Sequence, residues 1–304
     1  MKALAFGEIL WDIYSHKSVI GGAPFNFAAH FVKNGGEAYL LSSVGNDSLK
    51  CDTLKEIENK GVKTDYVVTN EKETGKCLVS LDENSVPTYN LLNDVAYDYI
   101  DISDVLKKKF DILYFGTLSL RGEWNFSQIK KLVSRGNFEE IFVDLNIRQP
   151  FSTEKAVIFG VETATVLKIS DEELDFVTNI LFGKELDYQK AAEKLAEKYP
   201  RIKFVIITLG NKGSYVYDSC NKKGFRNYGK RVEAVSSVGA GDSFSATFMY
   251  SYMTTRDIVF SLEMATRVSA FVVTNTEAIP DYDPEYIRIM PIESARPITD
   301  DSVT

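Results

Sequence analysis

Short runs of apolar and β-branched residues alternate along this chain with longer amphipathic stretches. Runs of this length are typical of strands that are buried on both faces. The apolar residues between 188 and 199 recur instead at helical spacing, which predicts a helix with one buried face. Strands that alternate with helices in this way predict a mostly parallel α/β sheet. The predicted strands cover residues 4–8, 38–44, 112–115, 141–145, 166–169 and 204–209.

Two stretches break this rhythm, because residues 11–20 and 75–91 alternate between apolar and polar at a period of two. Such alternation is typical of an antiparallel sheet with one exposed face. We therefore expect a small β lid, inserted into a larger domain, and a polar tail at the C-terminus. The expected division is an α/β domain of residues 1–10, 21–74 and 92–290, a lid of residues 11–20 and 75–91, and a tail of residues 291–304.

Composition narrows the function classes. The chain has 304 residues, of which 44% are hydrophobic, and a net charge of -8, so we expect no nucleic-acid or anionic-membrane partner. The three cysteines form no C-x-x-C, and the N-terminus does not look like a signal peptide, which favours a cytoplasmic protein with reduced thiols. With only His16 and His30, a Ser-His-Asp hydrolase or a histidine-rich metal site is disfavoured.

The stretch from Gly239 to Asp242 is the strongest candidate for chemistry. Gly239 and Gly241 allow a tight turn, and a helix predicted from about residue 240 to 254 would add its positive end, so the segment is suited to hold a phosphate. A carboxylate beside a phosphate suits proton abstraction from an incoming hydroxyl, and capping of the helix by Asp242 is the structural alternative. The P-loop and G-x-G-x-x-G motifs are both absent, which disfavours a P-loop NTPase and an ordinary NAD enzyme.

Polar residues also follow several predicted strands, where ligands of open α/β sheets bind. Asn146 and Arg148 follow the strand at 141–145, and Arg121 follows the strand at 112–115. An arginine at such a position could steady a sugar or a transferring phosphoryl group, or it could simply be a solvated surface residue.

Together, these segments resemble the pfkB, or ribokinase-like, family of carbohydrate kinases over almost the whole chain, and bacterial fructokinases most closely. Residues 21–28 (GGAPFNFA) are similar to the first signature of the family, and residues 239–242 to the core of its second. The resemblance implies a three-layer α/β/α fold with a mostly parallel central sheet and a small β-sheet lid. Further similar segments are residues 7–12, 86–89, 144–148 and 208–213.

The resemblance also implies roles for single residues. Asp12, Gly22 and Asn26 would bind sugar hydroxyls, and their carboxylate and amide groups offer hydrogen bonds that reject a substrate lacking a hydroxyl. Asp12 as a lid-turn residue and Asn26 as a helix-start residue are the structural alternatives. The other implied sugar-side residues are Tyr89, Arg121, Asn146 and Arg148; those on the catalytic cradle are Gly239, Ala240, Gly241 and the base Asp242; and those on the nucleotide side are Lys168, Thr208, Gly210, Gly213 and Thr266.

Some positions depart from the family pattern. Ser170 replaces the asparagine of an Asn-x-x-Glu motif, so Glu173 would either organise Mg²⁺ or close a capping box. Ser236 stands where the family's monovalent-cation site has a carboxylate, and Glu277 stands where the family has glycine. We therefore expect that K⁺ activation is lost or that Glu277 supplies the missing charge. Thr266 replaces an adenine-contacting asparagine, which leaves the nucleotide preference open.

The expected function is phosphorylation of the primary hydroxyl of a sugar by ATP with Mg²⁺, and fructose to fructose 6-phosphate is the first choice. Alternatives within the family are kinases for 2-keto-3-deoxygluconate, ribose or a nucleoside. A non-catalytic protein that binds a sugar or a nucleotide is the alternative outside catalysis. Lids of this family can pair, so a homodimer through the lid is also an expectation.

Overall fold

The computed structural model describes residues 1–81, 87–229 and 232–289. The predicted C-terminal tail lies outside the described residues, as does part of the predicted lid, residues 82–86. Within the described part, no helix is both long enough and apolar enough to cross a bilayer.

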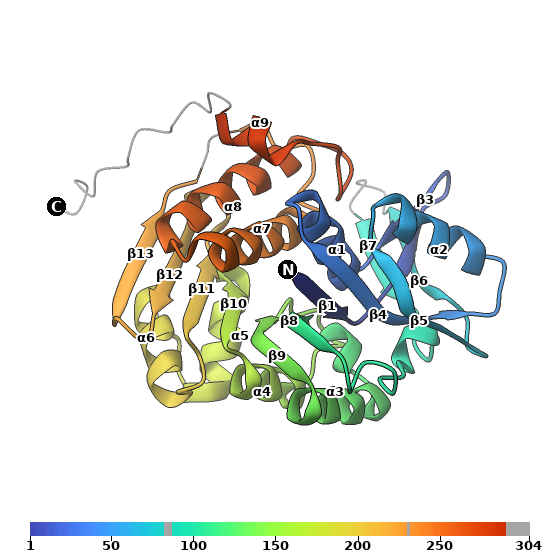
Figure 1. The fold of residues 1–304 in the computed structure, drawn as a ribbon, viewed down its shortest axis with the longest axis horizontal. Helices are drawn as coiled ribbons and strands as arrows, with labels where there is room; N and C mark the ends of the chain where they lie inside the picture. Colours follow the sequence, from blue (N-terminus) through green and yellow to red (C-terminus); the bar gives the residue numbers. More distant parts are fainter. Residues whose placement is uncertain (82–86, 230–231, 290–304) are drawn as a thin grey trace.

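A nine-stranded sheet forms the centre of the described structure (Figure 1), in the order β13-β12-β11-β10-β9-β8-β1-β4-β5. All neighbouring strands from β5 to β11 pair in parallel, whereas β12 and β13 add an antiparallel hairpin at one edge. The six predicted strands are confirmed as β1, β4, β8, β9, β10 and β11. The bounds are β1 Lys2–Phe6, β4 Glu37–Gly45, β5 Lys63–Asn70, β8 Lys109–Phe115, β9 Asn137–Asp144, β10 Val166–Ser170, β11 Phe204–Thr208, β12 Ser214–Asp218 and β13 Lys223–Asn227.

Helices cover both faces of this sheet, as the alternation of side chains along β1 shows. Leu4 and Phe6 point into a core with α3 to α6, whereas Ala3 and Ala5 point into a second core with α1, α2, α7 and α8. This arrangement confirms the three-layer α/β/α fold. The bounds are α1 Ala23–Lys33, α2 Lys50–Asn59, α3 Glu123–Arg135, α4 Glu154–Thr163, α5 Asp171–Phe182, α6 Tyr188–Lys198, α7 Ala240–Thr255, α8 Ile258–Val272 and α9 Pro284–Ile289, with 3₁₀ turns η1 Ala96–Asp98, η2 Leu118–Leu120 and η3 Gly210–Lys212.

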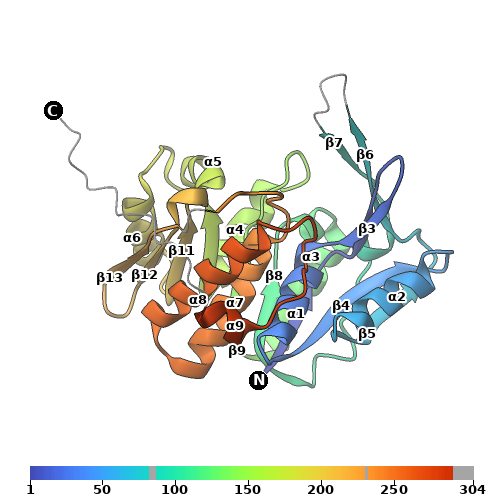
Figure 2. The same cartoon turned by 90° about the horizontal axis from the view of Figure 1, so that it is seen from above.

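A second, four-stranded sheet projects from the main body (Figure 2) in the order β3-β2-β6-β7. It is built from the two stretches with period-two alternation, as predicted. The prediction that it is antiparallel is wrong at its centre, because β2 and β6 pair in parallel. Each hairpin is antiparallel within itself, and the two hairpins join through the strands that leave the main body in the same direction. The bounds are β2 Leu10–Ile13, β3 Ser18–Gly21, β6 Gly75–Leu81 and β7 Pro87–Leu91.

Candidate active site

The glycine-rich segment forms a turn that leads into α7, as the sequence predicts. Gly239 has a φ of +80°, and a Cβ on it would lie 2.4 Å from the carbonyl oxygen of Ala278, so this position requires glycine. In the described chain, no side chain caps the start of α7. The N-H of Ala240 donates to the carbonyl oxygen of Ser237 at 3.3 Å, whereas the next N-H groups of α7, with the positive end of the helix, remain available to an anion. This observation disfavours the alternative that Asp242 serves only as a cap.

Asp242 lies beside the first signature of the sequence. The amide nitrogen Nδ2 of Asn26 donates to Oδ2 of Asp242 at 2.8 Å, across 216 positions of the chain. Burial, with a smaller contribution from the charge of Asp144, raises the pKa of Asp242 to about 6, although Asn26, Lys168 and Arg148 oppose the rise. A carboxylate with this pKa is ionised near neutrality and is a stronger base than an ordinary aspartate.

The buried ammonium of Lys168 lies directly behind this cradle. Its Nζ is 3.0 and 2.9 Å from the two carboxylate oxygens of Asp144, and both side chains are almost fully buried. A Cβ on Gly241 would lie 3.4 Å from the same Nζ. The hydroxyl of Ser245 is 3.1 Å from Asp144 and 2.9 Å from the carbonyl oxygen of Gly241. A fixed positive charge therefore reinforces the backbone amides of the cradle.

Glu173 closes the capping box that its spacing suggests. Its Oε2 accepts from the N-H of Ser170 at 2.8 Å, and its Oε1 accepts from the N-H of Ile147. Within residues 1–81, 87–229 and 232–289, no group of three or more His, Cys, Asp or Glu residues is placed to hold a metal. Both carboxylate oxygens of Glu173 therefore accept from backbone N-H groups, and a role of Glu173 in organising Mg²⁺ stays a prediction.

Strand register places Asp12 and Tyr89 on one face of the small sheet. Asp12 pairs with Cys77, and Val79, two residues further along β6, pairs with Tyr89. Burial raises the pKa of Asp12, while the thiol of Cys77 and the charge of Arg148 oppose the rise. Burial and the Asp12 carboxylate raise the pKa of Cys77 to about 12. The sequence analysis missed Cys77, because a lone cysteine carries no signal until its cross-strand partner is known.

Arg121 has a partner that the sequence did not suggest. Its Nε and Nη2 donate to the carboxylate of Asp98 at 2.8 and 2.7 Å, and Nη2 also donates to the carbonyl oxygen of Leu92 at the base of the small sheet. Both charged side chains are buried. A direct role of Arg121 in sugar binding stays a prediction, and the structure adds an anchoring role between the two sheets.

We expect Arg121→Met to destabilise the fold by about 3–5 kcal/mol, because it leaves the buried carboxylate of Asp98 unpaired. Urea unfolding at neutral pH measures this change. The exposed pair of Arg256 and Glu139 supplies the matched control, and Arg256→Met should cost about 1 kcal/mol or less. Equal effects of the two substitutions would contradict the anchoring role.

The predicted nucleotide-side residues lie around the ends of β10 and β11 and on α8. Thr208 is the register partner of Ser170 on the neighbouring strand. Thr266 is buried, and its hydroxyl has no hydrogen-bond partner in the described structure. A Cβ on Gly213 would lie 2.1 Å from the carbonyl oxygen of Asn227, so a glycine is required there. Gly210 is exposed in the turn between β11 and β12. Of the predicted sugar-side residues after β9, Arg148 is exposed and Asn146 is half-buried.

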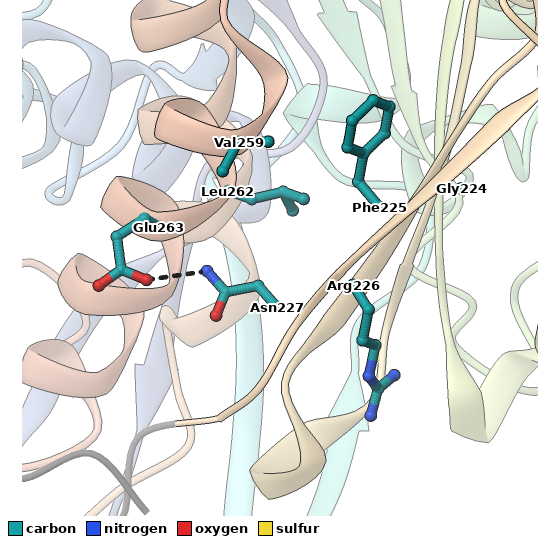
Figure 3. Close-up of a pocket in the computed structure, with 7 residues that line it drawn as sticks. All are labelled: Gly224, Phe225, Arg226, Asn227, Val259, Leu262 and Glu263. Carbon is teal, nitrogen blue, oxygen red and sulfur yellow. Dashed lines mark hydrogen bonds between the residues drawn. The ribbon is translucent and has the colours of Figure 1, made fainter. Parts of the chain in front are cut away.

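A cavity of about 380 Å³ lies between β13 and α8 (Figure 3). Phe225 and Leu262 line its apolar part, and the amide of Asn227 donates to Glu263 at 3.1 Å at one end. None of the predicted site residues lines this cavity. It is therefore separate from the cradle at the start of α7, although Glu263 lies one helical turn from Thr266.

The comparisons with known proteins agree over most of the chain. The model of the pfkB family carbohydrate kinases matches residues 7–284. Probable fructokinase-5 of Arabidopsis thaliana is 28% identical over 276 residues, which cover 82% of each protein. Adenosine kinase of Saccharomyces cerevisiae is 27% identical and is covered to 86%, with 94% of this chain aligned. The structure of fructokinase from Vibrio cholerae O395 in its fructose, ADP and calcium ion bound form has the same fold, with a TM-score of 0.77 and 22% identity over 91% of this chain and 94% of that one.

Proposed function

The chain belongs to the pfkB family of carbohydrate kinases, and we propose that it transfers the γ-phosphoryl group of ATP to the primary hydroxyl of fructose. The observation that carries this proposal is the contact between Asn26 and Asp242. It joins the segment proposed to bind the sugar to the segment proposed to bind the phosphoryl group. A hydroxyl held there would lie within reach of both a base and an anion cradle, which is what phosphoryl transfer to an alcohol requires.

The proposed steps follow from the chemistry of these groups. An alcohol is too weakly acidic to be ionised outright by an aspartate, so Asp242 accepts the proton as the new oxygen-phosphorus bond forms and the bond between the γ-phosphorus and the bridging oxygen breaks, which releases ADP. Amides of Ala240 and Gly241, with the ammonium of Lys168 behind them, stabilise the charge of the transferring phosphoryl group. Mg²⁺ would neutralise charge on the nucleotide phosphates, and Glu173 is the residue proposed to help hold it. The small sheet would close over the sugar and exclude water, which otherwise competes as acceptor.

Fructose is favoured over other sugars by the relatives with fructokinase names. The adenosine kinase, 5-dehydro-2-deoxygluconokinase and 6-phosphofructokinase relatives define the competing substrates. Two of the residues proposed to contact the sugar, Asp12 and Tyr89, lie on the small sheet. Substrate choice therefore depends on how that sheet meets the main body.

Release of ADP from ATP and Mg²⁺ tests the proposal against fructose, ribose, 2-keto-3-deoxygluconate and adenosine, with a reaction that lacks sugar as the blank. Turnover above the blank with fructose supports it. Turnover with another compound of the panel would support the proposed kinase activity but identify that compound, not fructose, as the substrate. Saturable sugar binding without turnover, seen as a thermal shift, would favour a binding protein instead.

We expect the rate to be the same in buffer with K⁺ and in buffer with tetramethylammonium in its place. Ser236 brings no carboxylate to the loop before the cradle, and the exposed Glu277 lies next to Ala278, which packs against Gly239. The initial rate of ADP release in the two buffers measures this. A rate that rises with K⁺ concentration would contradict the prediction, and loss of that rise in Glu277→Gln would show that this carboxylate supplies the missing charge of the cation site.

A further inference from the structure

Glu8 is a buried carboxyl group to which neither signature assigns a role. It follows β1 at the carboxyl end of the sheet, and only 3% of its surface is exposed. Its Oε1 accepts from the N-H of Ala23 at 3.3 Å. Gly22 has a φ of +122°, and a Cβ there would lie 2.3 Å from the carbonyl oxygen of Glu8. Backbone and side chain of Glu8 therefore both support the glycine turn.

This turn leads directly to the candidate base. Ala23 is the first residue of α1, and Asn26 lies in the first turn of the same helix. The amide of Asn26 donates to Asp242, while its Oδ1 is buried without a partner in the described structure. A displacement of the start of α1 would therefore displace the hydrogen bond that holds Asp242.

Glu8 forms no ion pair with any of the residues that the structure describes. Across the described residues, no lysine, arginine or histidine nitrogen forms an ion pair with it, and its Oε2 is buried without a hydrogen-bond partner. The guanidinium of Arg121 is nearby; Asp98 engages its Nε and Nη2, and its Nη1 is buried without a hydrogen bond to Glu8. A buried carboxylate that has only backbone N-H groups as partners and no ion pair is costly, so protonation is the less costly way to neutralise it.

The surroundings of the two neighbouring carboxyl groups favour an ionised Asp242 and a protonated Glu8. Asp242 has the amide of Asn26 at 2.8 Å and the charge of Lys168, whereas the charge of Arg148 acts on both carboxyl groups. Burial and, to a smaller extent, the charge of Asp242 raise the pKa of Glu8 to about 7, against the opposing effects of the N-H groups of Glu8 and Ala23 and of the charge of Arg148. Two neighbouring carboxyl groups in unlike surroundings typically take different protonation states. The titratable and charged groups that face Glu8 are Asp242 from α7, Arg148 after β9, Arg121 after η2, Tyr97 from η1 and Tyr114 from β8.

We propose that Glu8 is a positioning residue that works as a neutral acid: it holds the glycine turn and the start of α1, and leaves the negative charge of the site to Asp242. Its effect on catalysis rests on the proposed function, whereas its protonation state can be measured on the folded protein alone. Ionisation of Glu8 would place a second negative charge beside Asp242 and beside the position of the transferring phosphoryl group, where it opposes binding of the nucleotide.

The first arm of the test is the melting temperature of wild type and Glu8→Gln as a function of pH. A folded-state pKa of about 7 lies above the ordinary value of 4.5, so Glu8 costs the wild type stability as pH rises from about 4.5 to about 7. Glutamine stays neutral and lacks this cost. The Glu8→Gln variant should therefore gain stability relative to wild type over that window and keep the gain at higher pH.

Glu140 supplies the matched control. It is also buried, but it accepts from Lys203 at 2.7 Å and from Thr165 at 2.6 Å. Glu140→Gln should lower the melting temperature at neutral pH, because Lys203 loses its partner. A loss of stability of the same kind for Glu8→Gln above about pH 7 would show that Glu8 works as an anion, and would overturn the proposal.

The second arm is the pH profile of kcat/KM. We expect kcat/KM of wild type to decline as pH rises through about 7. The Glu8→Gln variant should lack this decline, and below about pH 7 its kcat/KM should stay within about threefold of the wild-type value. Glu8→Ala, which removes the contact with Ala23, should lower kcat by about tenfold or more. A Gln variant that keeps the wild-type decline, or that is as inactive as Ala at every pH, overturns the proposal. If no sugar supports turnover, the proposed function fails. The dependence of the melting temperature on pH still shows whether Glu8 is protonated or ionised.

Discussion

Asp242→Asn is expected to lower kcat by about 10²- to 10⁴-fold with little change in KM for sugar or ATP. Asparagine has nearly the same shape and can still accept the hydrogen bond from Asn26, so the start of α7 should keep its geometry. It cannot accept the proton of the attacking hydroxyl, which is lost only as the oxygen-phosphorus bond forms. Initial rates of ADP release over a range of sugar and ATP concentrations separate the two parameters.

Asp218 provides a matched control for this substitution. It is a buried aspartate at the end of β12 that accepts hydrogen bonds from the N-H groups of Cys220 and Asn221, away from the cradle. Asp218→Asn should leave kcat near that of wild type. Wild-type kcat/KM should also rise with pH through about 6 as Asp242 loses its proton, and the residual activity of Asp242→Asn should lack this rise. A variant at Asp242 that retains wild-type kcat would rule out the proposed base.

Lys168→Met is expected to lower kcat/KM by about 10²- to 10³-fold, the range for loss of one group that stabilises developing charge. The ammonium lies against Gly241, so its removal takes positive charge from the back of the cradle. The same substitution leaves the carboxylate of Asp144 buried without its ion-pair partner, which should cost about 3–5 kcal/mol of stability. Activity and urea unfolding must therefore be measured on the same preparations.

The double variant Lys168→Met with Asp144→Asn separates the two effects. It removes both members of the buried pair, so stability should largely return, whereas activity should stay low because the cradle still lacks its cation. Lys203→Met is the control for loss of a lysine from the same sheet, since Lys203 is partly exposed and lies at the start of β11, away from the cradle. Recovery of activity in the double variant would show that Lys168 acts only through stability.

The sequence was sufficient for the elements whose signals are local. The periods of the apolar residues identified six strands of the central sheet and both halves of the small sheet, because burial on one or two faces imposes these periods on the chain itself. The turn before α7 was also predicted, since Gly239 adopts a backbone conformation that other residues rarely take. The strands β5, β12 and β13 were not predicted. β5 and β13 form the two edges of the sheet and carry the weaker, more polar patterns expected of edge strands, whereas β12 is a buried strand next to β13.

The partners of the polar side chains were decided by the tertiary structure alone. Asn26 meets Asp242 across 216 positions, Lys168 meets Asp144 across 24, and Arg121 meets Asp98 across 23. Sequence motifs identified most of these residues but not their hydrogen-bond and ion-pair partners. They also assigned no role to Glu8. Burial, hydrogen bonds and neighbouring charges together decide whether a carboxyl group is ionised or protonated. The groups that impose these effects lie on strands and helices far apart in the chain, and they come together only when the protein folds. The sequence therefore determined the fold and the cradle, and the packing decided which carboxyl group keeps its charge.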